Sequence, residues 1–177
     1  VLDGDAVTGV TIIRLDEGMD TGPIVGSRET AIGPGENAQE LTARLFEMGA
    51  ELLVEILPLW ASGEKKARPQ DDSQATVTGR LSKEDGEIDW RLDTDRIARQ
   101  VRAYYPWPGT FTRWEGRLVK ITEASPAGSE VAADPSPGRV VSLPGGGLGI
   151  MTGGGVLEVG HLQLEGRRTV GAREFLQ

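Results

Sequence analysis

The feature that most constrains this chain is an alternating apolar and polar run near its start that leads directly into a short acidic loop. The run covers residues 9–15 and predicts a strand, and a second strand is expected at 23–30. Between them lies the sequence Asp16-Glu17-Gly18-Met19-Asp20-Thr21-Gly22. Because two strands hold its ends, such a loop can present a carboxylate at a fixed point.

Three interpretations of this loop follow from the residues alone. Asp and Gly are common turn formers, so the segment could be an ordinary β-turn. A calcium loop is excluded, because the D-x-[DN]-x-[DN]-G spacing and the closing Glu are absent. Asp20-Thr21-Gly22 spells the tripeptide of the aspartic proteases. That site needs two carboxylates that share one proton, so a single copy would have to act as a homodimer.

A fourth interpretation explains the whole stretch. Residues 9–24, G-V-T-I-I-R-L-D-E-G-M-D-T-G-P-I, resemble the signature of the folate-dependent formyltransferases, most closely their methionyl-tRNA branch. The resemblance implies that Asp20 is catalytic and that the loop lines the pocket for the pterin ring of the folate. The residues that it assigns to folate binding are Leu15, Asp16, Glu17, Gly18 and Met19.

Formyl transfer needs such a carboxylate. An amine attacks the formyl carbon, a tetrahedral intermediate forms, and a proton passes from the attacking nitrogen to the leaving nitrogen. A carboxylate can relay this proton directly or through one water. Hydrogen-bond donors must also stabilise the negative charge that develops on the formyl oxygen. In the family these donors are an Asn and a His of an Asn-x-His motif, near a Ser-Leu-Leu-Pro stretch.

Neither motif occurs in these 177 residues. The single histidine, His161, lies in an alternating segment far downstream and is interpreted as a strand residue. A lone histidine makes no metal site, and we expect none. The opening residues 1–5 resemble the helix end that precedes the signature in the family. We therefore expect the chain to be the C-terminal portion of a longer enzyme and to be inactive alone.

Composition indicates a globular protein with many turns, since 38% of the residues are hydrophobic, 26% are charged, and 25 are glycine. The chain has no cysteine, which excludes disulfides and thiolate metal sites and fits a cytosolic protein. No run approaches the roughly 20 apolar residues that span a bilayer. We expect a cytoplasmic monomer without a membrane partner.

The net charge of −8 argues against nucleic-acid binding, but the charge is unevenly distributed. Residues 1–63 carry eleven acids against three arginines, whereas residues 83–177 carry thirteen acids and twelve bases. Residues 64–82 are polar and have the composition of an interdomain linker. Its basic residues Lys65, Lys66 and Arg68 either belong to a solvated linker or form a handle for RNA phosphates.

Residues 1–63 are interpreted as the C-terminal remnant of an α/β, Rossmann-like formyltransferase domain. An apolar stripe predicts a helix from about Asn37 to Ala61 over one face of a sheet. Gly49 is expected to break this helix, and Pro58 to kink or shorten its second piece. The stripe comprises Leu41, Leu45, Phe46, Leu52, Leu53, Ile56, Leu57 and Trp60.

Residues 83–177 are predicted to form a small OB-like β-barrel domain, which is also the C-terminal fold of the family. Asp93 or Thr94 can cap a helix that runs to about Tyr104. Trp107, in a Pro-Trp-Pro-Gly stretch that resembles the family, is expected to pack beneath the barrel. Strands are expected near 110–114, 117–124, 138–143, 148–152 and 156–163.

The resemblance implies transfer of a formyl group from 10-formyltetrahydrofolate to the α-amino group of methionine on initiator methionyl-tRNA. Basic residues of the second domain are candidates for holding this tRNA: Lys83, Arg96, Arg99, Arg102, Arg167 and Arg168. One alternative keeps the folate chemistry but uses a sugar nucleotide or a purine precursor as acceptor, or hydrolyses formyl-folate. Another alternative is a non-catalytic RNA-binding module.

Overall fold

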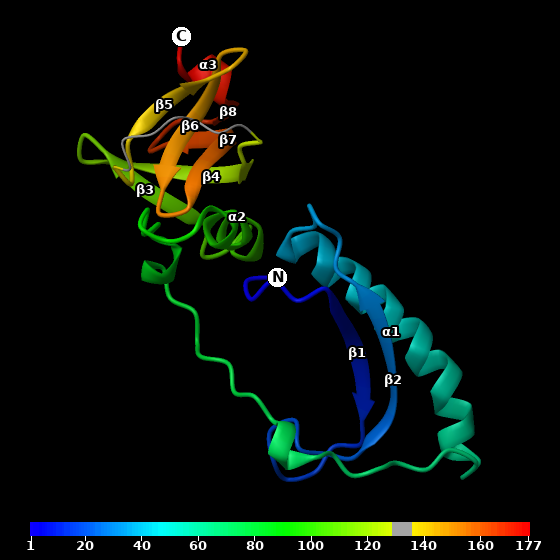
Figure 1. The fold of residues 1–177 in the computed structure, drawn as a ribbon. Helices are drawn as coiled ribbons and strands as arrows, with labels where there is room; N and C mark the ends of the chain where they lie inside the picture. The colour runs from blue at the N-terminus through cyan, green and yellow to red at the C-terminus, as the bar shows by residue number, and fades with distance from the viewer. Residues whose placement is uncertain (129–135) are drawn as a thin grey trace. The chain divides into compact units, whose positions relative to one another are not determined.

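The computed structural model describes residues 1–128 and 136–177, which group into two compact units. One unit is Asp5–Arg80, and the other combines Val1–Gly4 with Leu81–Gln177. Figure 1 shows a hairpin with one long helix in the first unit and a β-rich arrangement in the second.

The unit Asp5–Arg80 is built on a two-stranded antiparallel hairpin. Its elements are β1 (Val7–Ile13), β2 (Ile24–Ala31), α1 (Ala38–Ala61) and the 3-10 turn η1 (Asp72–Gln74). The pairing register shifts between Ile12 and Ile13, and β1 ends there. An irregularity of this kind bends a strand and interrupts its ladder. Residues 14 and 15, expected in the strand, therefore belong to the loop.

Helix α1 is continuous, so the expected break at Gly49 is wrong. The helix begins with a capping box, in which the Asn37 side chain accepts from the Glu40 amide and the Glu40 carboxylate accepts from the Asn37 amide. Gly49 faces the hairpin, because a Cβ there would lie 3.8 Å from the Val10 side chain. Packing against β1 keeps the helix intact there. Pro58 lies in the final turn, where its missing N–H removes one bond and the helix continues past it.

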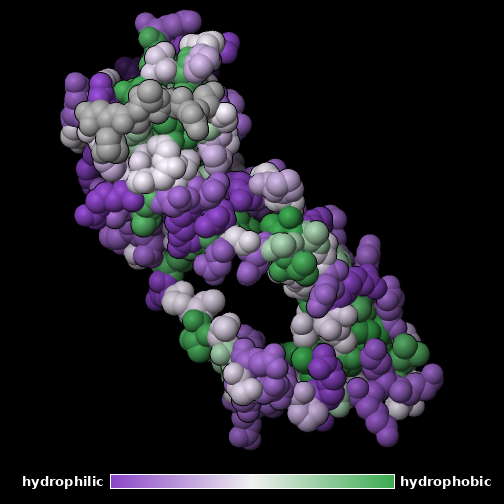
Figure 2. Space-filling model, in the orientation of Figure 1, coloured by the Kyte–Doolittle hydropathy of each residue, from purple (hydrophilic) through white to green (hydrophobic). Residues whose placement is uncertain are grey.

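The apolar stripe of α1 is wider than the hairpin that it covers. Leu52 and Ile56 are buried against Val25, whereas Phe46 and Leu57 are 76% and 55% exposed. Two strands are wide enough to bury only part of the stripe, so its other side chains lie at the surface. Figure 2 shows hydrophobic residues at the surface of this unit. Among the described residues, no helix combines the length and apolar content needed to cross a membrane.

The second unit is a six-stranded antiparallel sheet with helix α2 packed against it. Its elements are η2 (Glu84–Gly86), α2 (Thr94–Ala103), β3 (Thr110–Trp114), β4 (Arg117–Pro126), β5 (Val140–Leu143), β6 (Gly147–Thr152), β7 (Gly155–Leu164), β8 (Thr169–Gly171) and α3 (Ala172–Phe175). The strand order is β3-β4-β7-β6-β5, and β8 pairs with β7. The five predicted strands are present. The pairing of the described strands runs along an open path, so it does not show the closed OB-like barrel.

Helix α2 contributes one face to the core of this unit, and it begins at the predicted cap. The Asp93 side chain accepts from the amide of Asp95 and caps the helix. Ile97, Val101 and Tyr104 are 0%, 2% and 8% exposed. They lie one helical turn apart, so a single face of α2 meets the sheet.

Trp107 does not pack beneath the sheet. Its side chain is 55% exposed, and it lies in the turn that follows α2. The turn is closed by a hydrogen bond from the Gly109 amide to the Tyr104 carbonyl. Ile97 and Val101 of α2 already fill the space over the sheet, which leaves the tryptophan at the surface.

Leu157→Ala should lower the free energy of unfolding of the second unit by about 2–5 kcal/mol, because truncating a fully buried side chain leaves a cavity. Urea denaturation measures this loss. Val140→Ala is the matched control, since Val140 belongs to the same sheet but is 58% exposed, and it should change stability by less than about 0.5 kcal/mol. Equal losses in both variants would contradict the described core.

Candidate functional site

The candidate site is the acidic loop between β1 and β2. The Arg14 amide donates to the Pro23 carbonyl at 2.9 Å, which closes the base of the loop. Gly22 lies directly against this closure, because a Cβ there would be 1.9 Å from the Arg14 carbonyl oxygen. Only glycine fits at position 22 without moving the backbone.

Asp16 is engaged inside the loop. Its Oδ1 accepts from the Gly18 amide at 3.1 Å and from the Thr21 hydroxyl at 2.7 Å. An aspartate that bonds the backbone two residues ahead stabilises a turn locally. The Asp16 carboxylate therefore shapes the loop, and this hydrogen bonding distinguishes it from Asp20.

Asp20 lies in the left-handed region of backbone space, with φ of 57°. Among the described residues, only Glu115 is a second non-glycine residue of this kind. Aspartate tolerates this conformation better than most residues do, but at a cost. Residues held in such conformations occur often at functional sites. The Asp20 side chain is exposed.

Gln70 holds this part of the loop from a distant segment. Its Nε2 donates to the Asp20 carbonyl at 2.7 Å and to the Gly22 carbonyl at 2.6 Å. Gln70 is half-buried and lies in the segment predicted to be a linker. Sequence reasoning missed this residue, because one glutamine in a polar segment has no recognisable spacing relative to the loop.

The residues assigned to the folate lie together in this one exposed loop. Leu15 and Met19 are 85% and 90% exposed, and Glu17 is exposed as well. The loop therefore presents apolar as well as acidic side chains at the surface. In the described ranges 1–128 and 136–177, no cluster of three acidic or histidine side chains could hold a metal ion.

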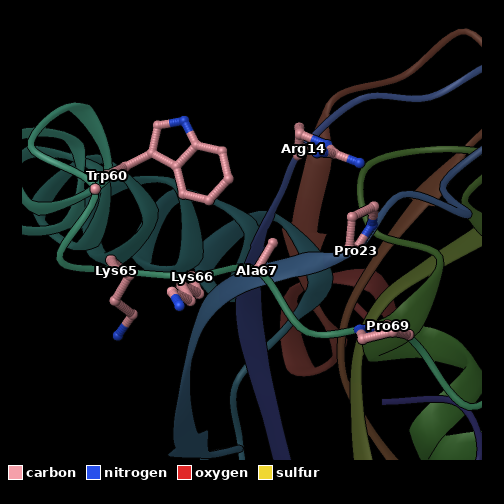
Figure 3. Close-up of a pocket in the computed structure, with 8 residues that line it drawn as sticks. Arg14, Pro23, Trp60, Lys65, Lys66, Ala67 and Pro69 are labelled. Carbon is pink, nitrogen blue, oxygen red and sulfur yellow. The ribbon is translucent and has the colours of Figure 1, made fainter.

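A hollow of about 420 Å³ lies beside the base of the loop (Figure 3). Three segments line it: the hairpin, the end of α1 and the chain that follows α1. Its lining residues are Arg14, Pro23, Trp60, Gly63, Lys65, Lys66, Ala67 and Pro69. Three cationic side chains around an open hollow attract anions. Lys65 and Lys66, predicted as part of a solvated linker or of a phosphate handle, belong to this hollow.

Two of the arginines predicted to hold tRNA contact the chain itself. Arg96 Nη1 donates to the Leu2 carbonyl, and Arg99 Nε donates to the same oxygen at 3.2 Å. Both contacts lie within the second unit. Burial lowers the pKa of Arg102, and the positive charge of Arg99 lowers it further.

The remaining candidates lie at the surface of the second unit. Lys83 is exposed at the start of η2, and Arg167 is exposed in the turn between β7 and β8. Arg168 forms an exposed ion pair with Glu174 of α3. An exposed pair of this kind is weak and can open for another anion.

The loop and the β-rich unit together define a protein class. Residues 80–177 match the sequence profile of the formyl transferase C-terminal domain, and residues 1–57 match that of formyl transferase. The chain belongs to the formyl transferase family.

Among its relatives is a methionyl-tRNA formyltransferase of Chloroflexus aggregans, which is 45% identical over 177 residues. The alignment covers 99% of this chain and 57% of that protein, so the chain spans little more than half the length of this relative.

Solved structures share the fold at low identity. HypX from Aquifex aeolicus in complex with tetrahydrofolic acid has a TM-score of 0.71 and 22% identity, over 99% of this chain and 31% of that chain. An N-formyltransferase from Helicobacter canadensis, in complex with folinic acid and dTDP-3-aminofucose, has a TM-score of 0.69 and 16% identity, over 89% of this chain and 57% of that chain.

Gly22→Ala should lower the free energy of unfolding of the hairpin unit by about 1–3 kcal/mol, because the added Cβ must displace the Arg14 carbonyl. Thermal denaturation followed by circular dichroism measures the change. Gly35→Ala is the matched control, since a Cβ there meets nothing within 4 Å. A loss no larger at position 22 than at position 35 would refute the close approach.

Proposed function

We propose that this chain is part of an enzyme that transfers a formyl group from 10-formyltetrahydrofolate to the α-amino group of methionine on initiator tRNA. The observation that carries the proposal is the 45% identity, over 99% of the chain, to a protein named methionyl-tRNA formyltransferase. The loop around Asp20 supports it, because the Arg14–Pro23 hydrogen bond closes the loop and the Gln70 side chain donates to the Asp20 carbonyl.

In this proposal Asp20 handles the proton. Its carboxylate takes a proton from the attacking amine and delivers it to the leaving nitrogen, as the new C–N bond forms and the old one breaks. Asp16 suits this role less well than Asp20, because its Oδ1 already accepts from Gly18 and Thr21. The resemblance assigns the donors for the formyl oxygen to an Asn-x-His motif outside these residues, and we propose that they complete the site.

The exposed loop fits a folate as one wall of its site. 10-Formyltetrahydrofolate supplies the formyl group. Leu15 and Met19 offer uncovered apolar surface to a flat ring, and the amide groups of the loop can bond its polar edge. We propose that Leu15, Asp16, Glu17, Gly18 and Met19 line the pterin pocket.

We assign residues 1–63 to the catalytic domain, residues 64–82 to the connection, and residues 83–177 to an OB-like tRNA-binding domain. The whole enzyme is proposed to be a cytoplasmic monomer, and the described part to need the rest of the catalytic domain for turnover. Within the tRNA-binding domain, we propose Lys83, Arg102, Arg167 and Arg168 as phosphate contacts. Arg96 and Arg99 already donate to the Leu2 carbonyl, so they would bind a tRNA phosphate only through their remaining N–H groups.

Another acceptor would leave the folate chemistry unchanged. The Helicobacter canadensis enzyme was solved with a nucleotide sugar, but at 16% identity it supports the fold and not the acceptor. Activity on a sugar nucleotide without activity on methionyl-tRNA would replace the tRNA part of the proposal.

Asp20→Asn, in the protein at its full natural length, should lower kcat by about 10²–10⁴-fold, because the amide cannot relay a proton. Asparagine tolerates the left-handed backbone as aspartate does, so folding and folate binding should persist. Single-turnover formylation and folate titration measure the two effects. Glu29→Gln, which removes an exposed acid of β2, should keep the normal rate. Near-normal turnover in Asp20→Asn would remove Asp20 from its role.

Replacing Arg167 and Arg168 with alanine should raise the KM for tRNA. It should also reduce the slope of log KM against log salt concentration by about one to two, since two phosphate contacts are lost. The KM for folate should not change. The double variant Arg91→Ala and Arg117→Ala removes two other exposed arginines of the same unit and serves as the control. Unchanged tRNA kinetics would show that Arg167 and Arg168 do not contact tRNA.

A further inference from the structure

The chain that follows α1 returns to the hairpin and pairs with it. The Ile24 amide donates to the Arg68 carbonyl at 2.8 Å, and the Arg68 amide donates to the Ile24 carbonyl at 2.9 Å. Figure 1 shows this segment running back from the end of α1 toward the loop between β1 and β2. This two-way bridge sets the position of the next residues, and it places Gln70 beside the end of the acidic loop.

The Gln70 amide meets two backbone carbonyls of the loop. Both partners, the oxygens of Asp20 and Gly22, can only accept hydrogen bonds, so the NH2 end of the side chain must face them. The two N–H groups of this one nitrogen are both used, at 2.7 and 2.6 Å. The amide therefore links the residues on either side of Thr21.

These bonds act on the part of the loop whose backbone conformation is least favourable. Asp20 has φ of 57°, and Asp16 holds the loop through Gly18 and Thr21 but not through the Asp20 backbone. An unfavourable backbone conformation persists only where surrounding contacts determine it. Among the described residues, the Gln70 side chain supplies such a contact at the Asp20 backbone.

We propose that Gln70 is a positioning residue that fixes the Asp20 backbone and so keeps the Asp20 carboxylate in one place for proton transfer. This inference rests on the proposed function of Asp20. Gln70 acts through the backbone of Asp20 and has no part in the proton transfer itself. A misplacement of about 1 Å can reduce a reaction rate about 10²-fold, so the position matters to kcat.

The chemistry of the contact requires an amide. A glutamate at position 70 would place carboxylate oxygens against two carbonyl oxygens, beside a loop that already holds three acids. A protonated glutamate could donate one of the two bonds. The ionisation of such a glutamate would therefore control the position of Asp20.

The test compares Gln70→Ala and Gln70→Glu with the parent protein at its full natural length. We expect kcat to fall about 10- to 100-fold in both variants, with the KM for tRNA and for folate unchanged. For Gln70→Glu, the rate relative to the parent should rise as the pH is lowered from 8 to 5. The rate of Gln70→Ala relative to the parent should stay constant over the same range.

Gln74→Ala is the matched control. Gln74 lies in the same segment, and its Nε2 donates to Asp71 at 2.7 Å rather than to a carbonyl of the loop. It should keep the parent kcat. A kcat in Gln70→Ala within twofold of the parent, or an equal loss in Gln74→Ala, would overturn the positioning role.

Asp20→Asn separates this inference from the function on which it rests. An inactive Asp20→Asn with a fully active Gln70→Ala overturns the positioning role alone. A fully active Asp20→Asn overturns the role of Asp20 and the positioning role with it. Inactive Asp20→Asn, slowed Gln70→Ala and unaffected Gln74→Ala together support both.

Discussion

The antiparallel pairing of β1 with β2 is the constraint on which the candidate site depends. It brings the Arg14 amide to the Pro23 carbonyl and leaves a short loop with both ends held. A short loop with both ends held has less backbone entropy left to lose than a long one. The hydrogen bonds of Asp16 and Gln70 can then impose one conformation, including the left-handed backbone of Asp20.

The polar residues of this loop and Gln70 differ in the hydrogen bonds that they make. Asp16 satisfies donors inside the loop, whereas the Asp20 carboxylate stays exposed. Gln70 uses its whole donor capacity on backbone carbonyls. Of the two aspartates in this short segment, Asp16 is thus the one whose carboxylate bonds within the loop. This difference in hydrogen bonding depends on geometry, because residue type alone does not distinguish the two aspartates.

The basic residues of the second unit divide in a similar way. Arg96, Arg99 and Arg102 follow one another at a spacing of three residues and so share one stripe of the helix. Such a stripe is most often a solvated helix face, and in a domain that holds tRNA it is also a candidate for phosphate contacts. The structure brings Leu2 to this stripe, and its carbonyl accepts from two of the three arginines. A helical spacing identifies which side chains share a face, but it cannot say what another part of the chain places on that face.

Periodicity and local chemistry were enough to predict many elements. The alternation that marks β1 and β2, the Asp93 cap of α2 and the five strands of the second unit all depend on neighbouring residues, and the structure has them. The resemblance of the loop identified the family, because that signature is contiguous. The exposure of Trp107, Phe46 and Leu57 was not predictable, since burial depends on what packs against a side chain.

The sequence by itself determined the strands, the capped helices and the contiguous acidic loop, because hydrogen bonding and side-chain periodicity over a few residues specify them. Only the tertiary structure decided that α1 continues through Gly49, where packing against Val10 compensates for the weak helix propensity of glycine. It also decided that Gln70 holds Asp20, fifty residues away in the chain. Contacts at such separations depend on how elements pack, which no local pattern of residues records.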